Sequence, residues 1–223
     1  MDSKDKQLYI ERYESRYKQY GYDSRTLGWG KNSKQNLRFK ILSEIDDFSE
    51  LNRSRILDLG CGFADLYSYL KSNGFEGEYT GVDIVPILIE EAKRRFPHLD
   101  LRLMDIEEAK LNKSIDYIFA SGIFNAKVFA EGGNLGHVER VIHKCFEMSN
   151  KGIAVDFLSS YVDYVAEINY HYDPVIIFEM AKRLSKRVTL RHDYLPYEFC
   201  IYIYKDDRIN SEFNAFESYL SNL

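Results

Sequence analysis

The strongest constraint on the fold is an alternation between short apolar runs and longer amphipathic stretches, which repeats five times from Arg55 onwards. This alternation is typical of parallel β-strands joined by helices that cover both faces of one sheet. Because such crossovers are right-handed, the sequence predicts an α/β fold with a doubly wound, mostly parallel, seven-stranded sheet. The expected strands are residues 55–59, 79–83, 99–104, 115–120, 152–158, 187–192 and 198–204. The last two form a hairpin, which adds one antiparallel strand at the C-terminal end.

Proline and aspartate mark where the intervening helices begin. Pro86 and Pro174 each suit a first helical turn, where proline is tolerated, and Asp173 suits the N-cap position before Pro174. The expected helices are residues 64–73, 86–96, 136–148 and 174–184.

The first 50 residues differ in character from the rest of the chain. A charged, tyrosine-rich helix is expected over residues 1–22, and a second helix over 33–48, with a glycine-rich break around Trp29 between them. We interpret residues 1–50 as a helical lid or arm and residues 51–223 as one compact domain. No linker long enough to separate two domains is visible, and a length of 223 residues fits one domain with an added arm.

Composition excludes several classes of protein. Lys and Arg total 30 against 35 Asp and Glu, and this net charge of −5 argues against a dedicated nucleic-acid binder. The three cysteines form no CxxC pair and predict neither a disulfide framework nor a metal site. The chain shows no signal-peptide core and no apolar stretch of the ~18 residues that span a membrane. A cytoplasmic protein without a membrane partner is therefore expected.

Tyrosine is unusually frequent, with 18 residues against one tryptophan. Many lie in the first 22 residues and in the last third of the chain. They fit either amphipathic packing with the phenol oxygens at the surface or an aromatic-lined ligand pocket, and we prefer the packing interpretation.

The motif Asp58-Leu-Gly60-Cys-Gly62 follows the first expected strand and leads into a helix. Glycines at such a turn let the backbone approach a ligand closely. A dinucleotide-binding motif would carry a third glycine where this chain has Asp65, and carboxylates at that position and at Asp58 disfavour a pyrophosphate. The loop therefore predicts a ligand with a cationic portion and no phosphates, or else simply a tight turn.

Two more acids end neighbouring strands. Asp83 lies one strand-helix-strand unit after Asp58, where a carboxylate can accept both hydroxyls of a ribose. Asp105 ends the third strand, where it can accept from an adenine amino group while the Ile106 N–H donates to the ring. Helix capping is the alternative role for both acids.

Taken together, DLGCGFAD, TGVD, LMDI and IDYIFASGIFN resemble the class I S-adenosylmethionine-dependent methyltransferases, over about residues 55–205. The resemblance implies a Rossmann-like fold and S-adenosylmethionine as cofactor. It places Gly60 and Gly62 against the methionine portion, Asp83 with Ile84 at the ribose, and Asp105 with Ile106 at the adenine. It places Ser121 near the methionine end. The Asn/Asp-Pro-Pro-Tyr signature of amino-group methylation of nucleic acids is absent, because Ser121-Gly-Ile-Phe-Asn125 stands there instead.

The N-terminal segment offers two further cofactor-binding candidates. Trp29 could fold over the cofactor and attract its sulfonium through the ring face. Arg38, or Gln35 one turn before it, could bind the cofactor carboxylate or an anionic acceptor. A packed aromatic residue and a solvated helix face are the alternatives.

If the methyl acceptor is a hydroxyl group, a general base accelerates the transfer. His192, beside Asp193 at the expected end of the sixth strand, and His171, in the loop after the fifth strand, are the two catalytic candidates. Structural roles are the alternative for both, and they are the preferred interpretation for His98, His137 and His143.

The sequence therefore predicts an S-adenosylmethionine-dependent methyltransferase that acts on a small polar molecule, with O-methylation favoured. An RNA or protein methyltransferase and a cofactor-binding regulator without catalysis are the alternatives. A nicotinamide oxidoreductase is disfavoured by Asp65. The acceptor and the oligomeric state are left open.

Overall fold

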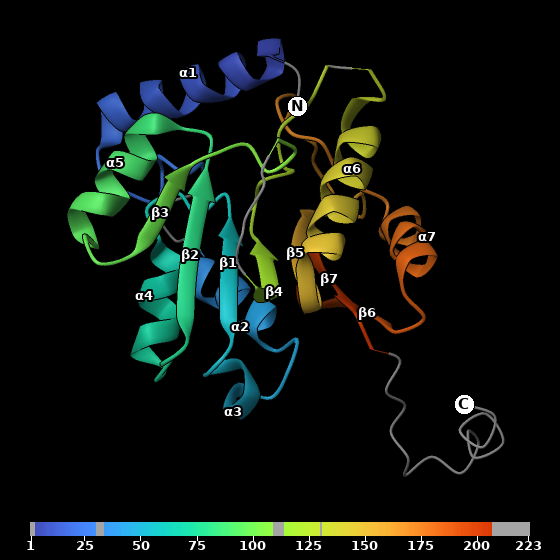
Figure 1. Ribbon diagram of the computed structural model, residues 1–223. Helices are drawn as coiled ribbons and strands as arrows, with labels where there is room; N and C mark the ends of the chain where they lie inside the picture. Colours follow the sequence, from blue (N-terminus) through green and yellow to red (C-terminus); the bar gives the residue numbers. More distant parts are fainter. Residues whose placement is uncertain (1–2, 30–33, 109–113, 130, 207–223) are drawn as a thin grey trace, which may run out of the picture.

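The computed structural model describes residues 3–29, 34–108, 114–129 and 131–206. Its seven strands form one sheet in the order β3-β2-β1-β4-β5-β7-β6 (Figure 1). Neighbouring strands from β3 to β5 are parallel, and β7 lies antiparallel between β5 and β6. The predicted mostly parallel, doubly wound sheet with an antiparallel C-terminal strand is confirmed.

The strands are β1 (Arg55–Leu59), β2 (Glu78–Asp83), β3 (Asp100–Leu103), β4 (Ile115–Ala120), β5 (Ser149–Leu158), β6 (Val188–Leu195) and β7 (Glu198–Tyr204). The helices are α1 (Ser3–Tyr20), α2 (Gln35–Ser43), α3 (Phe48–Leu51), α4 (Asp65–Ser72), α5 (Pro86–Arg95), α6 (Gly133–Met148) and α7 (Pro174–Leu184). As predicted, Asp173 caps α7 by accepting a hydrogen bond from the Val175 N–H at 2.8 Å.

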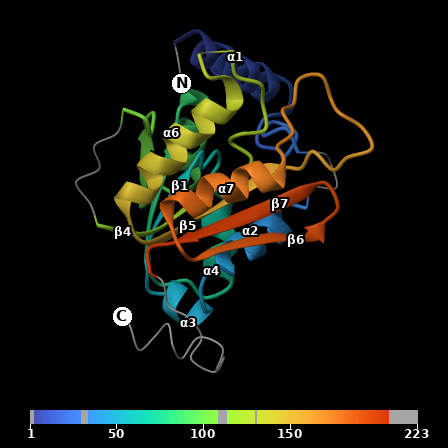
Figure 2. The ribbon, with the colours of Figure 1, turned by 90° about the vertical axis from the view of Figure 1, so that its right-hand side faces the viewer.

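Helices cover both faces of the sheet. Buried residues of α6 and α7 share one hydrophobic cluster with β4, β5 and β7, and Figure 2 shows these two helices lying across that face. Buried residues of α2, α4 and α5 form a second cluster on the opposite face. Central strands are therefore buried on both sides, and all six residues of β4 are buried.

The segment predicted as a lid divides into two parts. Helix α1 lies across the carboxyl ends of the parallel strands and packs on α5 (Figure 1). Helix α2 instead packs against β5 with Phe39 and Leu42 buried, so it belongs to the layer that covers the sheet. The single helix predicted over 33–48 is two helices, α2 and α3, and its expected start at Ser33 lies outside the described residues.

Strand β6 is longer than predicted. It extends to Leu195, so His192 lies within the strand and not beyond its end. A register shift between Arg191 and Leu195 interrupts its pairing with β7 at this point. No helix in the described part of the chain is long and apolar enough to cross a bilayer.

Phe157 tests the packing of the α6 and α7 face. Its ring stacks on Phe124 and Phe199 at centroid distances of 5.4 and 5.2 Å, and it is 1% exposed. Phe157→Ala should lower the free energy of unfolding by about 3–5 kcal/mol, because the cavity cannot close fully. Urea denaturation measures this loss. The matched control is Phe129→Ala, whose ring is 74% exposed, and an equal loss in both variants would contradict the packing described.

Candidate functional site

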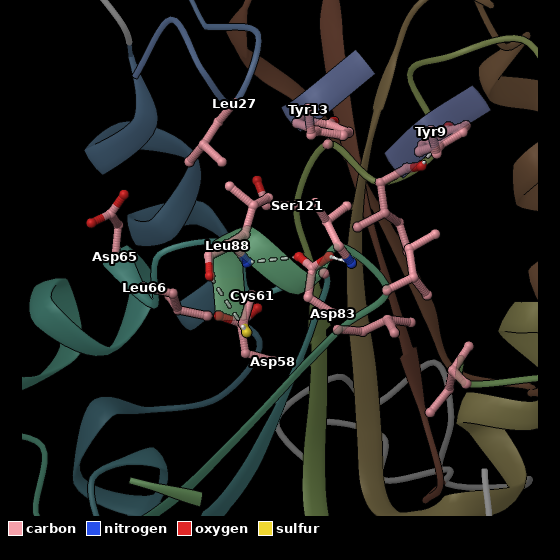
Figure 3. A pocket seen from close by; sticks show the side chains of 18 of the residues that line it. Tyr9, Tyr13, Leu27, Asp58, Cys61, Asp65, Leu66, Asp83, Leu88 and Ser121 are labelled. Atoms are coloured by element: carbon pink, nitrogen blue, oxygen red, sulfur yellow. Dashed lines mark hydrogen bonds between the residues drawn. The ribbon is translucent and has the colours of Figure 1, made fainter. Parts of the chain in front are cut away.

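A cavity that opens to solvent lies at the carboxyl ends of β1, β2 and β4 beneath α1 (Figure 3). This is where ligands bind in sheets of this topology. Eleven of its lining residues were predicted from the sequence as ligand contacts or as part of the glycine loop: Trp29, Gln35, Asp58, Gly60, Gly62, Asp65, Asp83, Ile84, Asp105, Ile106 and Ser121. The sequence motifs are therefore brought together at one place.

The glycine loop lets two segments approach each other closely. Gly60 has a φ of 73°, and a Cβ atom there would lie 2.2 Å from Cγ2 of Ile123 in the segment after β4. Gly62 has a φ of 51°, also in the left-handed region that favours glycine. Ala64, two residues later, has a φ of 61° and is fully buried. Backbone strain of this kind is concentrated at functional sites.

Asp83 holds the glycine loop in place. Its Oδ2 accepts a hydrogen bond from the Gly62 N–H and its Oδ1 accepts one from the Val85 N–H, both at 2.9 Å. Burial raises the pKa of this carboxyl group, and the backbone N–H groups oppose that rise. Each oxygen keeps a further lone pair, so the carboxylate can still accept from ligand hydroxyls.

Asp58 forms the floor of the cavity below Asp83 (Figure 3). Burial raises its pKa to about 7, and a hydrogen bond donated by the Tyr79 hydroxyl opposes this shift. The negative charges of Asp83 and Asp65 add to the rise. Asp58 is therefore a carboxyl group whose charge changes near neutral pH.

Asp105 connects the cavity to α1. Its carboxylate lies 3.0 Å from the Lys6 ammonium, and its Oδ1 accepts from the Glu107 N–H at 3.0 Å. The residues described after Asp105 form a turn and no helix, so this hydrogen bond caps a turn and not the helix that the sequence suggested. Asp105 also lies in the cavity wall. Ile106 is 4% exposed and lines the same wall.

Asp156 lies in β5 and holds Ser121 and Gly122, the two residues that follow β4 beside the cavity. Its carboxylate accepts from the Ser121 hydroxyl at 2.5 Å and from the Gly122 N–H at 2.7 Å. Burial raises its pKa to about 6. Sequence reasoning did not select Asp156, although an acid inside an apolar strand was a signal for it.

Helix α1 roofs the cavity. Tyr9 and Tyr13, one turn apart on one face of the helix, lie above Asp83 and Asp58 (Figure 3). The Tyr9 hydroxyl donates to the Ile123 carbonyl at 3.2 Å, and Asp5 accepts from the Phe129 N–H at 3.0 Å. Tyr13 is half-buried, and the loss of solvent around its hydroxyl raises its pKa. The packing interpretation of these tyrosines is therefore incomplete, because two of them line a pocket.

Trp29 and Arg38 occupy different positions relative to the cavity. Trp29 lines it, and its ring packs so tightly on Gly122 that a Cβ atom there would lie 2.6 Å from Cζ2. Arg38 does not line it. Its guanidinium lies 4.1 Å from the centre of the Trp29 ring and donates two hydrogen bonds to Glu198. Its Nη1 is buried without a hydrogen-bond partner, so binding of a ligand carboxylate by Arg38 stays a prediction.

Neither predicted catalytic histidine lines the cavity. The Nδ1 of His171 lies 2.8 Å from the Ser159 carbonyl oxygen. The His192 ring stacks on Tyr161 at a centroid distance of 6.0 Å and meets Phe199 edge-to-face at 6.1 Å. His137, for which only a structural role was expected, does line it. Its Nδ1 lies 2.8 Å from Glu107, and burial lowers its pKa.

The charged side chains that line the cavity are acidic. Its described lining residues include the four acids Asp58, Asp65, Asp83 and Asp105 and no Lys or Arg. Such a lining suits a ligand that carries cations and hydroxyl groups but no phosphate, and S-adenosylmethionine has a sulfonium, an ammonium and a ribose. Among the residues described, no group of three or more His, Cys, Asp or Glu could hold a metal ion. The three cysteines are free and buried.

Comparison with known proteins identifies the family. Residues 51–187 match the family described as methyltransferase domain. A Mycobacterium tuberculosis protein, described as a methyltransferase with no acceptor named, is 35% identical over 173 residues, which cover 74% of this chain and 98% of that protein. A malonyl-[acyl-carrier protein] O-methyltransferase of Acetivibrio thermocellus is 34% identical over 85 residues, which cover 37% of this chain and 30% of that protein.

Solved structures show the same fold. The magnesium protoporphyrin IX methyltransferase of Synechocystis PCC 6803, crystallised with S-adenosylmethionine, superposes with a TM-score of 0.65 at 13% identity and covers 92% of this chain and 98% of its own. The chain therefore belongs to the methyltransferase-domain family and is a class I enzyme that uses S-adenosylmethionine as cofactor.

Asp83→Asn tests the support of the glycine loop. The asparagine can accept only through its oxygen, so its NH₂ group would face one of the two backbone N–H donors. We expect cofactor affinity to fall by about tenfold to a hundredfold, the effect of losing ~1.5–3 kcal/mol from a charged hydrogen bond. The measurement is the shift in melting temperature caused by S-adenosylhomocysteine.

Asp116→Asn is the matched control for that experiment. Asp116 also accepts from a backbone N–H, that of Arg55 at 2.9 Å, but it lies at the opposite end of the strands. The Asp116→Asn variant should lose stability but keep the shift in melting temperature that S-adenosylhomocysteine causes. An unchanged shift in Asp83→Asn would contradict the role given to Asp83.

The pKa of Asp58 predicts a pH dependence. Because the folded-state pKa is raised to about 7, unliganded protein should lose stability as pH rises from the ordinary aspartate range through 7. Affinity for the cationic cofactor should rise over the same window, because the carboxyl group ionises. Urea denaturation of the unliganded protein measures the stability slope across this range, and isothermal titration with S-adenosylmethionine measures the affinity slope, each in wild type and Asp58→Asn. Parallel slopes in the two proteins would rule out Asp58 as their source.

Trp29 is the sole tryptophan, so its fluorescence reports on the cavity wall. Glu198→Gln leaves the buried Arg38 guanidinium without its counter-charge, a change that costs about 3–5 kcal/mol in comparable pairs. We expect Trp29 emission to shift to longer wavelength as the ring loosens. Glu44→Gln, which removes a surface partner of Arg191 at 2.9 Å, is the control. The same spectrum in both variants would show that Glu198 does not position Trp29.

Proposed function

We propose that this methyltransferase transfers the methyl group to a hydroxyl oxygen of a small polar molecule. The observation that carries the proposal is the roof formed by α1. The ion pair between Lys6 and Asp105 and the contact of Tyr9 with Ile123 fasten α1 over the cavity. A small acceptor fits beneath such a roof, whereas a folded macromolecule does not.

Within this proposal the lining residues divide by role. Asp83 and Ile84 hold the ribose, Asp105 and Ile106 hold the adenine, and Gly60, Gly62 and Ser121 lie along the methionine portion. Asp58 supplies negative charge beneath the cationic groups. The site orients both molecules and excludes water, and alignment alone can contribute ~7–11 kcal/mol to catalysis.

When bound, S-adenosylmethionine supplies an electrophilic methyl group on a sulfonium sulfur. The acceptor hydroxyl has to give up its proton as its oxygen takes the methyl group. Of the two proposed bases, His171 has the better defined tautomer, because its Nδ1 faces a carbonyl oxygen and therefore carries the hydrogen, although its ring does not line the cavity. Its Nε2, buried without a hydrogen-bond partner, is then left to accept a proton.

The names of two relatives point to acceptors other than nucleic acid. One is an O-methyltransferase that acts on malonyl-[acyl-carrier protein], and the other acts on magnesium protoporphyrin IX. The alternative of an RNA acceptor is opposed by the net charge of −5 and by the absence of Lys and Arg among the described lining residues. The other two alternatives, a protein acceptor and a regulator without catalysis, are tested by the labelling experiment below.

Transfer of a deuterated methyl group tests the proposal. Wild-type protein and S-adenosylmethionine labelled at the methyl group are incubated separately with a metabolite extract, total RNA and a protein extract. We expect mass spectrometry to find the label in a small molecule, on oxygen, and Asp83→Asn to transfer little. Label in RNA or protein would overturn the acceptor class. Binding without transfer to any fraction would favour the regulator.

A further inference from the structure

A second hollow opens beside the cofactor cavity. It lies open to solvent between the segment after α1, helices α2 and α4, and the last residue of α5. Gln35 and Asp65 line both hollows, so the two adjoin each other. Asp65 is only three residues beyond Gly62, so the hollow reaches the cavity beside the glycine loop. We call it the polar groove.

Every side chain that lines the polar groove carries nitrogen or oxygen. The lining residues are Tyr22, Asp23, Ser24, Gln35, Asn36, Asp65, Ser68, Tyr69, Ser72 and Arg95. An apolar ligand would gain little from such a surface, because ligand pockets are usually lined mainly by apolar groups. Hydroxyl, amide and phenol groups both donate and accept, as the hydroxyl groups of a ligand do.

Two of these residues have hydrogen-bonding capacity to spare. In the part of the chain that the structure describes, the side chains of Asn36 and Ser68 make no hydrogen bond. Tyr22 adds a ring that is 50% exposed and is held by Phe63 at 5.0 Å and by the Arg95 guanidinium at 3.8 Å. A fixed, half-exposed ring next to uncommitted polar groups suits a ligand with both C–H faces and hydroxyl groups.

The charges of the polar groove are balanced by ion pairs. Arg95 lies 2.9 Å from Asp65, and it also donates to the Phe63 carbonyl at 2.8 Å. Asp23 is paired with Arg25 at 2.8 Å. Among the described residues that line the groove, no surplus positive charge is left for a phosphate or a carboxylate, which normally require Arg or Lys.

We propose that the polar groove binds an uncharged, hydroxyl-rich part of the acceptor, a sugar or a polyol, and directs one hydroxyl group past Gln35 and Asp65 into the cofactor cavity. This inference rests on the proposed function and names the chemical class of its acceptor. In the reaction a bond forms between the sugar oxygen and the methyl carbon. The carbon–sulfur bond breaks with its electron pair going to sulfur, and the hydroxyl proton passes to a base or to water.

Saturation-transfer difference NMR tests the proposal on protein saturated with S-adenosylhomocysteine. The probes are the methyl glycosides of glucose, galactose, mannose and rhamnose, together with inositol, and glucose 6-phosphate is the charged comparison. We expect signals from at least one neutral probe and a weaker signal from the phosphate. Asn36→Trp and Ser68→Trp, which fill the groove, should each weaken binding by about tenfold and leave the affinity for S-adenosylhomocysteine unchanged.

Lys40→Trp is the matched control, because Lys40 is exposed on the same helix as Asn36 but does not line the groove. It should bind the probes as the wild type does. Absence of signal from every neutral probe, undiminished signals in both groove variants, or a stronger signal from glucose 6-phosphate would overturn the inference. Calorimetry with S-adenosylhomocysteine is done before the NMR. Protein that does not bind S-adenosylhomocysteine would count against the proposed function. Protein that binds S-adenosylhomocysteine but none of the neutral probes would count against the groove alone.

Discussion

The cofactor cavity depends on one carboxylate. Asp83 ends β2 and accepts hydrogen bonds from the glycine loop after β1 and from Val85, the residue directly before α5. Three elements that meet at the carboxyl end of the sheet are thereby held in one arrangement, with the loop's backbone facing the cavity. Because the loop carries no side chain at Gly60, the segment after β4 can close against it. These two contacts hold the wall of the cavity in place.

Helix α1, the roof of the cavity, controls access to the site. Helix α1 is joined to the cavity walls by polar contacts at Asp5, Lys6 and Tyr9, which bind respectively the segment after β4, the end of β3 and the carbonyl of Ile123. A lid fastened in this way limits the size of what can enter from above. The polar groove at the side then offers a second approach, and its balanced charges set it apart from the acidic cavity it joins.

The sequence predicted the sheet and most of the cavity, because apolar runs mark buried strands and the motifs stand directly after them. It did not predict the contributions of Tyr9, Tyr13 and His137, which depend on how α1 and α6 pack over the sheet. It also could not show that Arg38 pairs with Glu198, since 160 residues separate them and only folding brings them together. The end of β6 was missed because polar residues interrupt the apolar pattern there.

Calorimetric titration of the purified protein with S-adenosylmethionine and, in parallel, with NADH tests the account most directly. Both ligands contain adenosine, but only NADH has a pyrophosphate, which the acidic cavity should repel. The account predicts micromolar binding of S-adenosylmethionine and no measurable binding of NADH. Tight binding of NADH, or equal affinity for the two, would contradict the assignment of the cavity.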